Sequence, residues 1–187
     1  MKKSKGALRL LFNGKGRIEC LLLLAFITLP FCSLNAQRRV DYAVHANIIY
    51  HFTKYIQWPE DLGTTEFVIG IVGDSPVLEE LKKAVANKSI KSQKIVVRQF
   101  QASQKSFNCK ILFLSQEESG SLKKVIAKTA GSPVLLVTED EGLARRGACI
   151  NFIIVAERLK LEINKKNLEL RGLGIASELL QLGTIVK

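Results

Sequence analysis

Most of the chain alternates between short apolar runs and polar stretches with helical spacing. Five runs are continuously apolar or β-branched, which predicts strands: 67–72, 94–100, 111–114, 134–137 and 150–155. Between them, segments 77–85 and 122–129 carry apolar residues three or four positions apart, which predicts amphipathic helices. Strands that alternate with helices form a mostly parallel sheet covered on both faces. The pattern therefore predicts a three-layer α/β/α sandwich.

Turn-forming and capping residues predict where these helices begin. Ser75 is expected to cap the helix that follows, with Pro76 at its first position. Ser115–Glu118 and Thr138–Glu141 each place a Ser or Thr three residues before a Glu, which is the spacing of a capping box. We therefore expect one helix to begin near residue 115 and a second, short one near residue 138.

The alternation changes at Gly147. The runs 149–155 and 158–163 are joined only by Ala156 and Glu157, too few residues for a helical crossover, so the two strands must form an antiparallel hairpin. Apolar and polar residues alternate strictly along 159–164, which predicts one buried and one exposed face. Two helices, 165–172 and 175–183, are expected to complete the fold.

An aromatic helix is predicted for 42–57. Its apolar residues recur three or four apart and are expected to form one side that packs on the sheet: Val44, Ile48, Phe52, Tyr55 and Ile56. Because Pro59 pushes the preceding residue toward extended angles, the helix is expected to stop near Gln57. The only tryptophan of the chain, Trp58, is thereby placed at a helix end beside a rigid turn.

The first 36 residues have the pattern of a signal peptide. A basic lead is followed by an apolar run, 20–34, which is interrupted by Pro30, and Leu34-Asn35-Ala36 supplies small residues for cleavage. This run is shorter than the roughly 20 residues that a membrane span needs. We expect export to the periplasm with cleavage near Ala36, leaving a single domain over 37–187; an uncleaved membrane anchor is the alternative.

Removal of this segment changes the charge. The whole chain has a formal net charge of +11, but residues 37–187 keep 22 basic and 16 acidic residues, which gives +6. The remaining lysines are scattered, and no basic stripe alternates with stacking aromatic residues. The sequence therefore predicts a solvated surface and no nucleic-acid partner.

Two cysteines, Cys109 and Cys149, remain after the signal region. Two cysteines in an exported chain fit one disulfide, and both precede apolar strands. A disulfide would close a loop of about 40 residues and stabilise the fold by roughly 3–4 kcal/mol if it is unstrained. Buried free thiols are the alternative, because spacing in sequence does not establish the distance between the two residues.

Patterns for catalysis, metal binding and cofactor binding are missing. His45 and His51 lie six residues apart and fall on different faces of a helix, unlike the four-residue spacing of zinc-binding helices. The turn at Gly73 lacks the glycine spacing of a phosphate-binding loop. Several carboxylates are placed at predicted helix starts, where they complement the helix dipole: Glu117, Glu118, Glu139, Asp140 and Glu141. We therefore predict no enzyme activity, no cofactor and no metal, with an unrecognised hydrolase or transferase as the remote alternative.

Five short motifs in order resemble the YfiR/HmsC-like family. The first is an aromatic helix ending in Lys54-Tyr55, two residues and Trp58-Pro59. A cysteine before an apolar strand, an acidic segment ending in Gly142, and Leu161-Glu162-Ile163-Asn164 follow. The close, 172–180, is similar to the family ending, although Arg171 stands where many members carry a small residue. The resemblance extends over 41–187.

The resemblance implies an exported, non-enzymatic regulator with an α/β sandwich fold. Proteins similar to YfiR act in the periplasm by restraining a membrane-anchored sensor, typically a diguanylate cyclase, and envelope stress or redox change relieves the restraint. The resemblance thus links the chain to cyclic-di-GMP signalling and biofilm control. A disulfide between Cys109 and Cys149 would be a structural staple or a redox sensor.

The expected partner surface combines the turn after the aromatic helix with the closing segment. Its candidate residues are Tyr55, Trp58, Pro59, Asn164, Arg171 and Ser177. Trp58 plugging the core and Asn164 capping a helix are the structural alternatives. The alternative function is a small-molecule-binding module with its ligand at the carboxyl ends of the strands. The sequence leaves a homodimer open.

Overall fold

The computed structural model describes residues 40–59 and 64–187, and Val40–Lys187 forms one compact unit. The expected signal peptide and its cleavage near Ala36 lie outside the described residues. Within the described ranges, no helix is long and apolar enough to cross a membrane.

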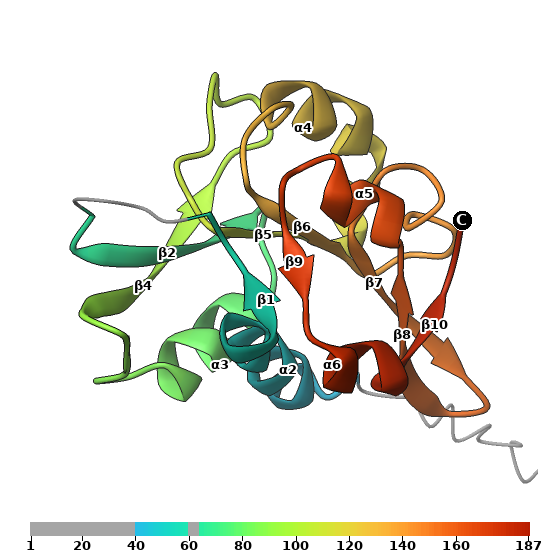
Figure 1. The fold of residues 1–187 in the computed structure, drawn as a ribbon, viewed down its shortest axis with the longest axis horizontal. Helices are drawn as coiled ribbons and strands as arrows, with labels where there is room; N and C mark the ends of the chain where they lie inside the picture. The colour runs from blue at the N-terminus through green and yellow to red at the C-terminus, as the bar shows by residue number, and fades with distance from the viewer. Residues whose placement is uncertain (1–39, 60–63) are drawn as a thin grey trace, which may run out of the picture. The chain divides into compact units, whose positions relative to one another are not determined.

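A mixed, mostly parallel sheet forms the centre of the unit (Figure 1). Eight strands of the described chain pair in the order β10-β8-β7-β6-β5-β2-β4-β3. Their bounds are β2 Glu66–Val72, β3 Ser89–Ile90, β4 Gln93–Phe100, β5 Ile111–Leu114, β6 Leu135–Thr138, β7 Ile150–Val155, β8 Arg158–Ile163 and β10 Gly183–Ile185. Neighbours from β4 to β7 are parallel, whereas β7 and β8 are antiparallel and form the predicted hairpin.

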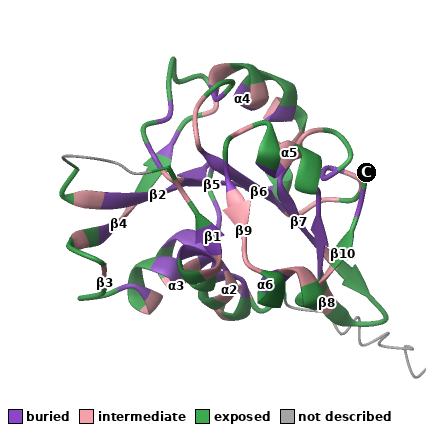
Figure 2. Ribbon diagram, in the orientation of Figure 1, coloured by how far each residue is buried: buried purple, intermediate pink, exposed green. Residues whose placement is uncertain are grey.

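Two layers of helices cover this sheet. In Figure 1, α2 (Tyr42–Tyr55), α3 (Val77–Ala84) and α6 (Ser177–Leu182) lie below the sheet. The helices α4 (Leu122–Lys128), which follows the 3₁₀ helix η1 (Gln116–Ser121), and α5 (Lys165–Glu169) lie above it. Every residue of β5 and β6 is buried between the layers, as Figure 2 shows. The predicted three-layer α/β/α sandwich is confirmed.

A close contact with an aromatic ring requires glycine at one position of strand β2. A side chain at Gly70 in β2 would place its Cβ 2.5 Å from the ring of Phe100 in β4. The ring occupies the space above the β2 backbone, because the buried face shared by β2 and its parallel neighbour β4 must be filled without voids. Gly70 is therefore a packing requirement and not part of a phosphate-binding loop.

The aromatic helix differs from the prediction in its end and in its buried face. It ends at Tyr55, and Ile56–Gln57 forms a short strand, β1, paired with β9 (Gly174–Ile175). Its buried apolar side chains are Ala46, Ile49 and Phe52, whereas Val44 is 42% exposed. The helix is thus apolar on two sides: Ile48 and Tyr55 are partly buried and pack against the core, whereas Val44 of the predicted side is exposed.

Both predicted capping boxes are wrong. The Ser115 side chain makes no cap hydrogen bond, and the chain continues as the 3₁₀ helix η1. Thr138 is the last residue of β6, and its hydroxyl donates to Oδ1 of Asn151 at 2.7 Å. A helix is absent from the described turns 139–149, which connect β6 directly to β7. A tertiary partner thus replaces the expected cap at Thr138, whereas the buried Ser115 hydroxyl has no hydrogen-bond partner among the described residues.

The hairpin turn between β7 and β8 contains a strained residue. Ala156 and Glu157 both have positive φ, 47° and 67°, in the left-handed region that two-residue hairpin turns require. An alanine there costs about 1–2 kcal/mol, whereas asparagine is tolerated.

We therefore expect Ala156→Asn to raise the free energy of unfolding by about 1 kcal/mol. Urea denaturation followed by circular dichroism measures the change. The same substitution at exposed Ala127 in α4 is the control and should destabilise by about 0.6 kcal/mol, because asparagine is a poor helix former. A loss of stability from Ala156→Asn would contradict the strained turn.

Candidate functional site

The predicted surface residues do not form one site. Trp58 is half-buried: its ring stands edge-on against Phe67 at 5.1 Å, and its Nε1 donates to the carbonyl of Lys110 at 3.3 Å. Trp58 and Pro59 line a cleft of about 480 Å³ that also borders Phe67 and Lys110. The indole therefore helps to hold β1 against the sheet and keeps part of its surface exposed.

Asn164 and Arg171 stabilise loops. Asn164 is buried, and its Oδ1 accepts the N–H of Asn167 at 3.1 Å, which caps α5. Its Nδ2 donates to the carbonyl of Ala144 at 3.0 Å. Arg171 donates from Nη1 to the carbonyl and hydroxyl of Thr129 at 3.2 and 3.1 Å, at the end of α4. These contacts give both residues a local structural role.

Tyr55 belongs to an apolar groove, and Ser177 begins the helix that forms one of its walls. The groove has a volume of about 330 Å³ and lies between α2, β8 and α6. Its lining is mainly apolar and includes Ile48, Phe52, Tyr55, Leu159, Leu161, Leu179 and Leu182. The structure thus brings Tyr55 next to the closing helix that begins at Ser177, and it places Trp58, Pro59, Asn164 and Arg171 outside this groove.

The candidate disulfide is not formed. Cys109 and Cys149 are both buried free thiols. They precede β5 and β7, and β6 lies between these strands. Two inter-strand spacings amount to about 10 Å, whereas a disulfide needs Cα atoms within about 7 Å.

Burial also makes both thiols unreactive. It raises the pKa of Cys109 to about 12 and raises the pKa of Cys149 as well. The thiolate is the reactive form, so these cysteines lack the property that a redox sensor needs.

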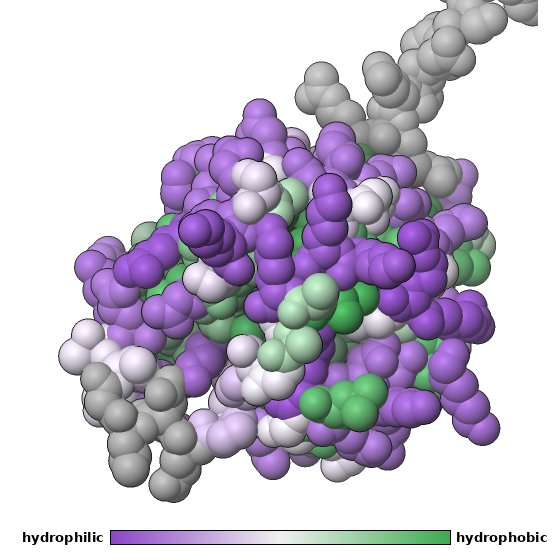
Figure 3. Space-filling model, turned by 90° about the horizontal axis from the view of Figure 1, so that it is seen from above, coloured by the Kyte–Doolittle hydropathy of each residue, from purple (hydrophilic) through white to green (hydrophobic). Residues whose placement is uncertain are grey.

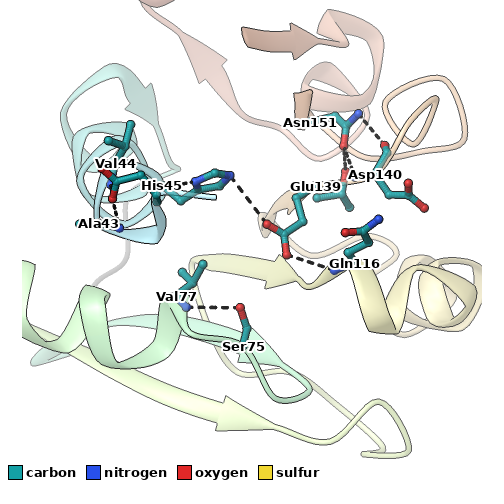
Figure 4. Close-up of polar contacts among 11 residues, drawn as sticks. Ala43, Val44, His45, Ser75, Val77, Gln116, Glu139, Asp140 and Asn151 are labelled. Carbon is teal, nitrogen blue, oxygen red and sulfur yellow. Dashed lines mark hydrogen bonds and ion pairs between the residues drawn. The ribbon is translucent and has the colours of Figure 1, made fainter. Parts of the chain in front are cut away.

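A second cluster of polar side chains lies at the carboxyl edge of the parallel strands (Figure 4). His45 projects from α2 toward Glu139, which directly follows β6. Their side chains are 4% and 7% exposed, and Nε2 of His45 lies 3.8 Å from Oε2 of Glu139. The backbone N–H of Gln116 donates to Oε1 of Glu139 at 3.1 Å. Phe152 packs edge-on against the His45 ring at 4.7 Å.

Burial dominates the electrostatics of this pair. The pKa of Glu139 is raised to about 7, chiefly by desolvation; the hydrogen bond from Gln116 lowers it, and the nearby carboxylates of Glu117 and Asp140 contribute to the rise. Desolvation also lowers the pKa of His45 from its ordinary value of 6.5, although the carbonyl and carboxylate of Asp41 oppose this shift. Both side chains are therefore held toward their neutral forms.

A buried amide anchors the loop that carries Glu139. Asn151 in β7 is fully buried, and its Nδ2 donates to the carbonyl of Asp140 at 2.8 Å and to Oε2 of Glu162 at 3.0 Å. Its Oδ1 accepts from the Thr138 hydroxyl and, at 3.3 Å, from the N–H of Asp140. Glu162 is consequently buried, which contradicts the exposed face predicted for its strand. The Asn151 amide fixes the position at which Glu139 leaves the sheet.

This cluster was not predicted from the sequence. Glu139 was expected at a helix start, and His45 was considered as a metal ligand together with His51. The sequence shows only that His45 lies within an apolar helix and that Glu139 follows an apolar strand. Their contact depends on how α2 packs against the end of β6. Among residues 40–59 and 64–187, no group of three His, Cys, Asp or Glu side chains could hold a metal ion.

The cysteines give a labelling prediction. We compare the reaction of Cys109 and Cys149 with a maleimide in native and in denatured protein, both without reductant. Both cysteines should react at least about tenfold more slowly in the native protein, because burial suppresses the thiolate. Peptide mass spectrometry measures the reaction at each cysteine, and Ser103→Cys in an exposed loop should react at the same rate in both states. Failure of the denatured protein to label without reductant would reveal a disulfide.

The raised pKa of Glu139 gives a pH prediction. Between about pH 4.5 and 7 the folded state holds a proton on Glu139 that the unfolded chain releases, so this group lowers stability as pH rises. Glu139→Gln should therefore stabilise the protein by about 2 kcal/mol near pH 8 and by less than about 0.5 kcal/mol near pH 5. The lowered pKa of His45 has the opposite effect on stability below about pH 6.5, and it is present in both proteins.

Thermal denaturation at the two pH values measures this difference. Glu141→Gln removes an equal charge from an exposed position two residues away and should have little effect at either pH. Equal stabilisation by Glu139→Gln at both pH values would rule out a buried carboxylate at this position.

A family model described as YfiR/HmsC-like matches residues 42–184 of the 187-residue chain. No curated protein matches the chain. The match begins with α2 and ends within β10, so it includes the sheet, the groove and the His45–Glu139 cluster. The resemblance predicted from the motifs is confirmed, and the chain belongs to the YfiR/HmsC-like family.

Proposed function

We propose that this chain is an exported, non-enzymatic regulatory protein that binds and restrains the periplasmic domain of a membrane-anchored sensor. The sensor would be of the diguanylate cyclase or histidine kinase type. Family membership supports a regulatory role, and the N-terminal sequence pattern supports export. The observation that carries the proposal is the uncovered apolar side of α2 together with α6.

Exposed apolar residues surround the groove. Leu182 in α6 is 68% exposed and lines the groove directly. Ile154 in the hairpin pairs with the groove residue Leu159 and is 46% exposed, and Ile185 in the edge strand β10 is 47% exposed. Contiguous apolar surface on a small domain commonly marks a protein interface. The docking surface proposed here consists of the groove and these flanking residues.

The opposite layer has a different character. Figure 3 shows the molecule from above, over α4 and α5, where hydrophilic residues cover most of the surface and hydrophobic ones appear as separate small areas. Leu170 beside α5 is 70% exposed, which makes it a matched comparison for Leu182. An apolar partner surface is therefore complementary to the groove and much less so to the α4–α5 layer.

The proposal predicts that Leu182→Asp weakens binding to the partner by at least about tenfold, because burying a leucine contributes roughly 1.5–3 kcal/mol. Calorimetry with the purified periplasmic domain of a membrane sensor encoded beside this chain measures the affinity. The output of the sensor in membranes, such as cyclase turnover, should fall when the wild-type chain is added and should fall less with Leu182→Asp.

Leu170→Asp is the control, because it changes an equally exposed leucine on the other layer. It should keep wild-type affinity, and both variants should keep the wild-type melting temperature. If both variants bind as tightly as wild type, the groove is not the docking surface. If the wild-type chain neither binds nor restrains the sensor, the proposed function is wrong for that partner.

A further inference from the structure

The cluster at the carboxyl edge of the sheet contains a mismatched pair of hydrogen-bonding groups. Nδ1 of His45 lies 3.1 Å from the carbonyl of Asp41, which can only accept, so Nδ1 carries the proton. In the neutral ring this leaves Nε2 as an acceptor. Above the raised pKa of Glu139, where its carboxyl is ionised and can only accept, Nε2 faces Oε2 of Glu139 at 3.8 Å, which is too long for a direct hydrogen bond.

Neither acceptor has a hydrogen-bond donor elsewhere in the described part of the chain. Both side chains are more than nine-tenths buried, and their only mutual contact is the 3.8 Å approach. Buried polar groups are normally paired, so two acceptors that face each other indicate a place for a donor between them. A single donor nitrogen can bond to both atoms at this separation.

The cleft beside the pair is suited to a cationic donor. It has a volume of about 190 Å³, and its lining includes Tyr42, His45, Glu139, Asp140 and Glu141. The described lining contains no lysine or arginine, although the chain as a whole is basic. Carboxylates attract a cation, and aromatic rings next to them stabilise it further.

The remainder of the cleft is apolar. Phe152, Ile154 and Leu159 form its other wall. A metal ion would leave this wall without a partner, and a strongly acidic ligand would be repelled by the carboxylates. A short aliphatic or aromatic body attached to an ammonium group matches both walls, and the small volume limits that body to a few carbon atoms or one ring.

We propose that this cleft binds a small primary ammonium compound, whose nitrogen donates to Oε2 of Glu139 and Nε2 of His45 while its apolar body contacts Phe152, Ile154 and Leu159. The site is separate from the docking groove, but Leu159 lines both. A bound amine would therefore contact a residue of the surface proposed to engage a partner.

Binding of phenethylamine to the purified chain, measured above the raised pKa of Glu139 so that this carboxylate is ionised, tests the proposal without any protein partner. Nuclear magnetic resonance should show the His45 ring protonated at Nδ1 and a saturable shift of its Nε2 signal with a Kd of about 1 mM or tighter, as expected for a ligand of this size. His51, which is exposed, should not shift and serves as an internal control. Phenethyl alcohol, which lacks the charge, and phenylalanine, which adds a carboxylate, should each bind at least about tenfold more weakly.

Two variants separate the site from a general charge effect. Glu139→Gln should weaken phenethylamine binding by at least about tenfold, whereas Glu178→Gln, which removes a carboxylate from α6, should leave it unchanged. His45→Phe keeps an aromatic ring and removes the acceptor, so it should also weaken binding.

The proposal is overturned if phenethylamine gives no saturable shift, if the alcohol binds equally well, or if Glu139→Gln binds like wild type. The absence of a saturable shift would mean that the donor between the two acceptors is a water molecule and not an amine. Because no sensor domain is present, none of these results bears on the docking proposal.

Discussion

Burial of the central strands on both faces is the constraint on which the rest of the molecule depends. All residues of β5 and β6, and all but the first of β2, are buried. Such strands leave no room for polar groups along their length, since a buried polar group without a partner is costly. Polar chemistry is therefore restricted to the strand ends, where Glu139 and Asn151 lie, and partner contacts to the outer helices and the hairpin.

The helix α2 connects these two kinds of surface. One side packs Ala46, Ile49 and Phe52 into the core, and the next side places His45 at the carboxyl edge of the sheet. Its remaining apolar residues, including Ile48 and Tyr55, line the groove beside α6. A second apolar side on a surface helix lowers solubility unless a partner covers it. In this chain the second side of α2 lies beside exposed apolar residues of α6 and of the hairpin, such as Leu182 and Ile154.

The polar groups at the sheet edge differ in how well they are satisfied. Asn151 uses both amide hydrogens and its oxygen in close hydrogen bonds, so it rigidifies the turn between β6 and β7. The side chains of His45 and Glu139 are 4% and 7% exposed and approach each other only to 3.8 Å. Buried polar groups that lack a hydrogen-bond partner are concentrated at functional sites, because a ligand can supply the missing partner. This contrast within one edge distinguishes a structural network from a candidate site.

Much of the architecture could be predicted from the sequence, because it depends on periodicity within short segments. The continuous apolar runs determined the parallel strands, and the two-residue link at Ala156 and Glu157 determined the hairpin. The family motifs likewise identified the chain, since they need only short stretches in order. The cap at Asn164 followed from local spacing for the same reason.

Other features were decided only by tertiary structure, because they depend on contacts between residues far apart in the sequence. Periodicity showed that α2 is amphipathic but not which of its apolar residues would face the sheet, and it placed Val44 in a core that excludes it. Thr138 and Ser115 lost their predicted capping roles to strand pairing and to η1. Cys109 and Cys149 were separated by the insertion of β6 between their strands, and His45 met Glu139 only because α2 crosses the sheet edge at the end of β6. Strand order and helix rotation are properties of the whole packed unit, so no local pattern contains them.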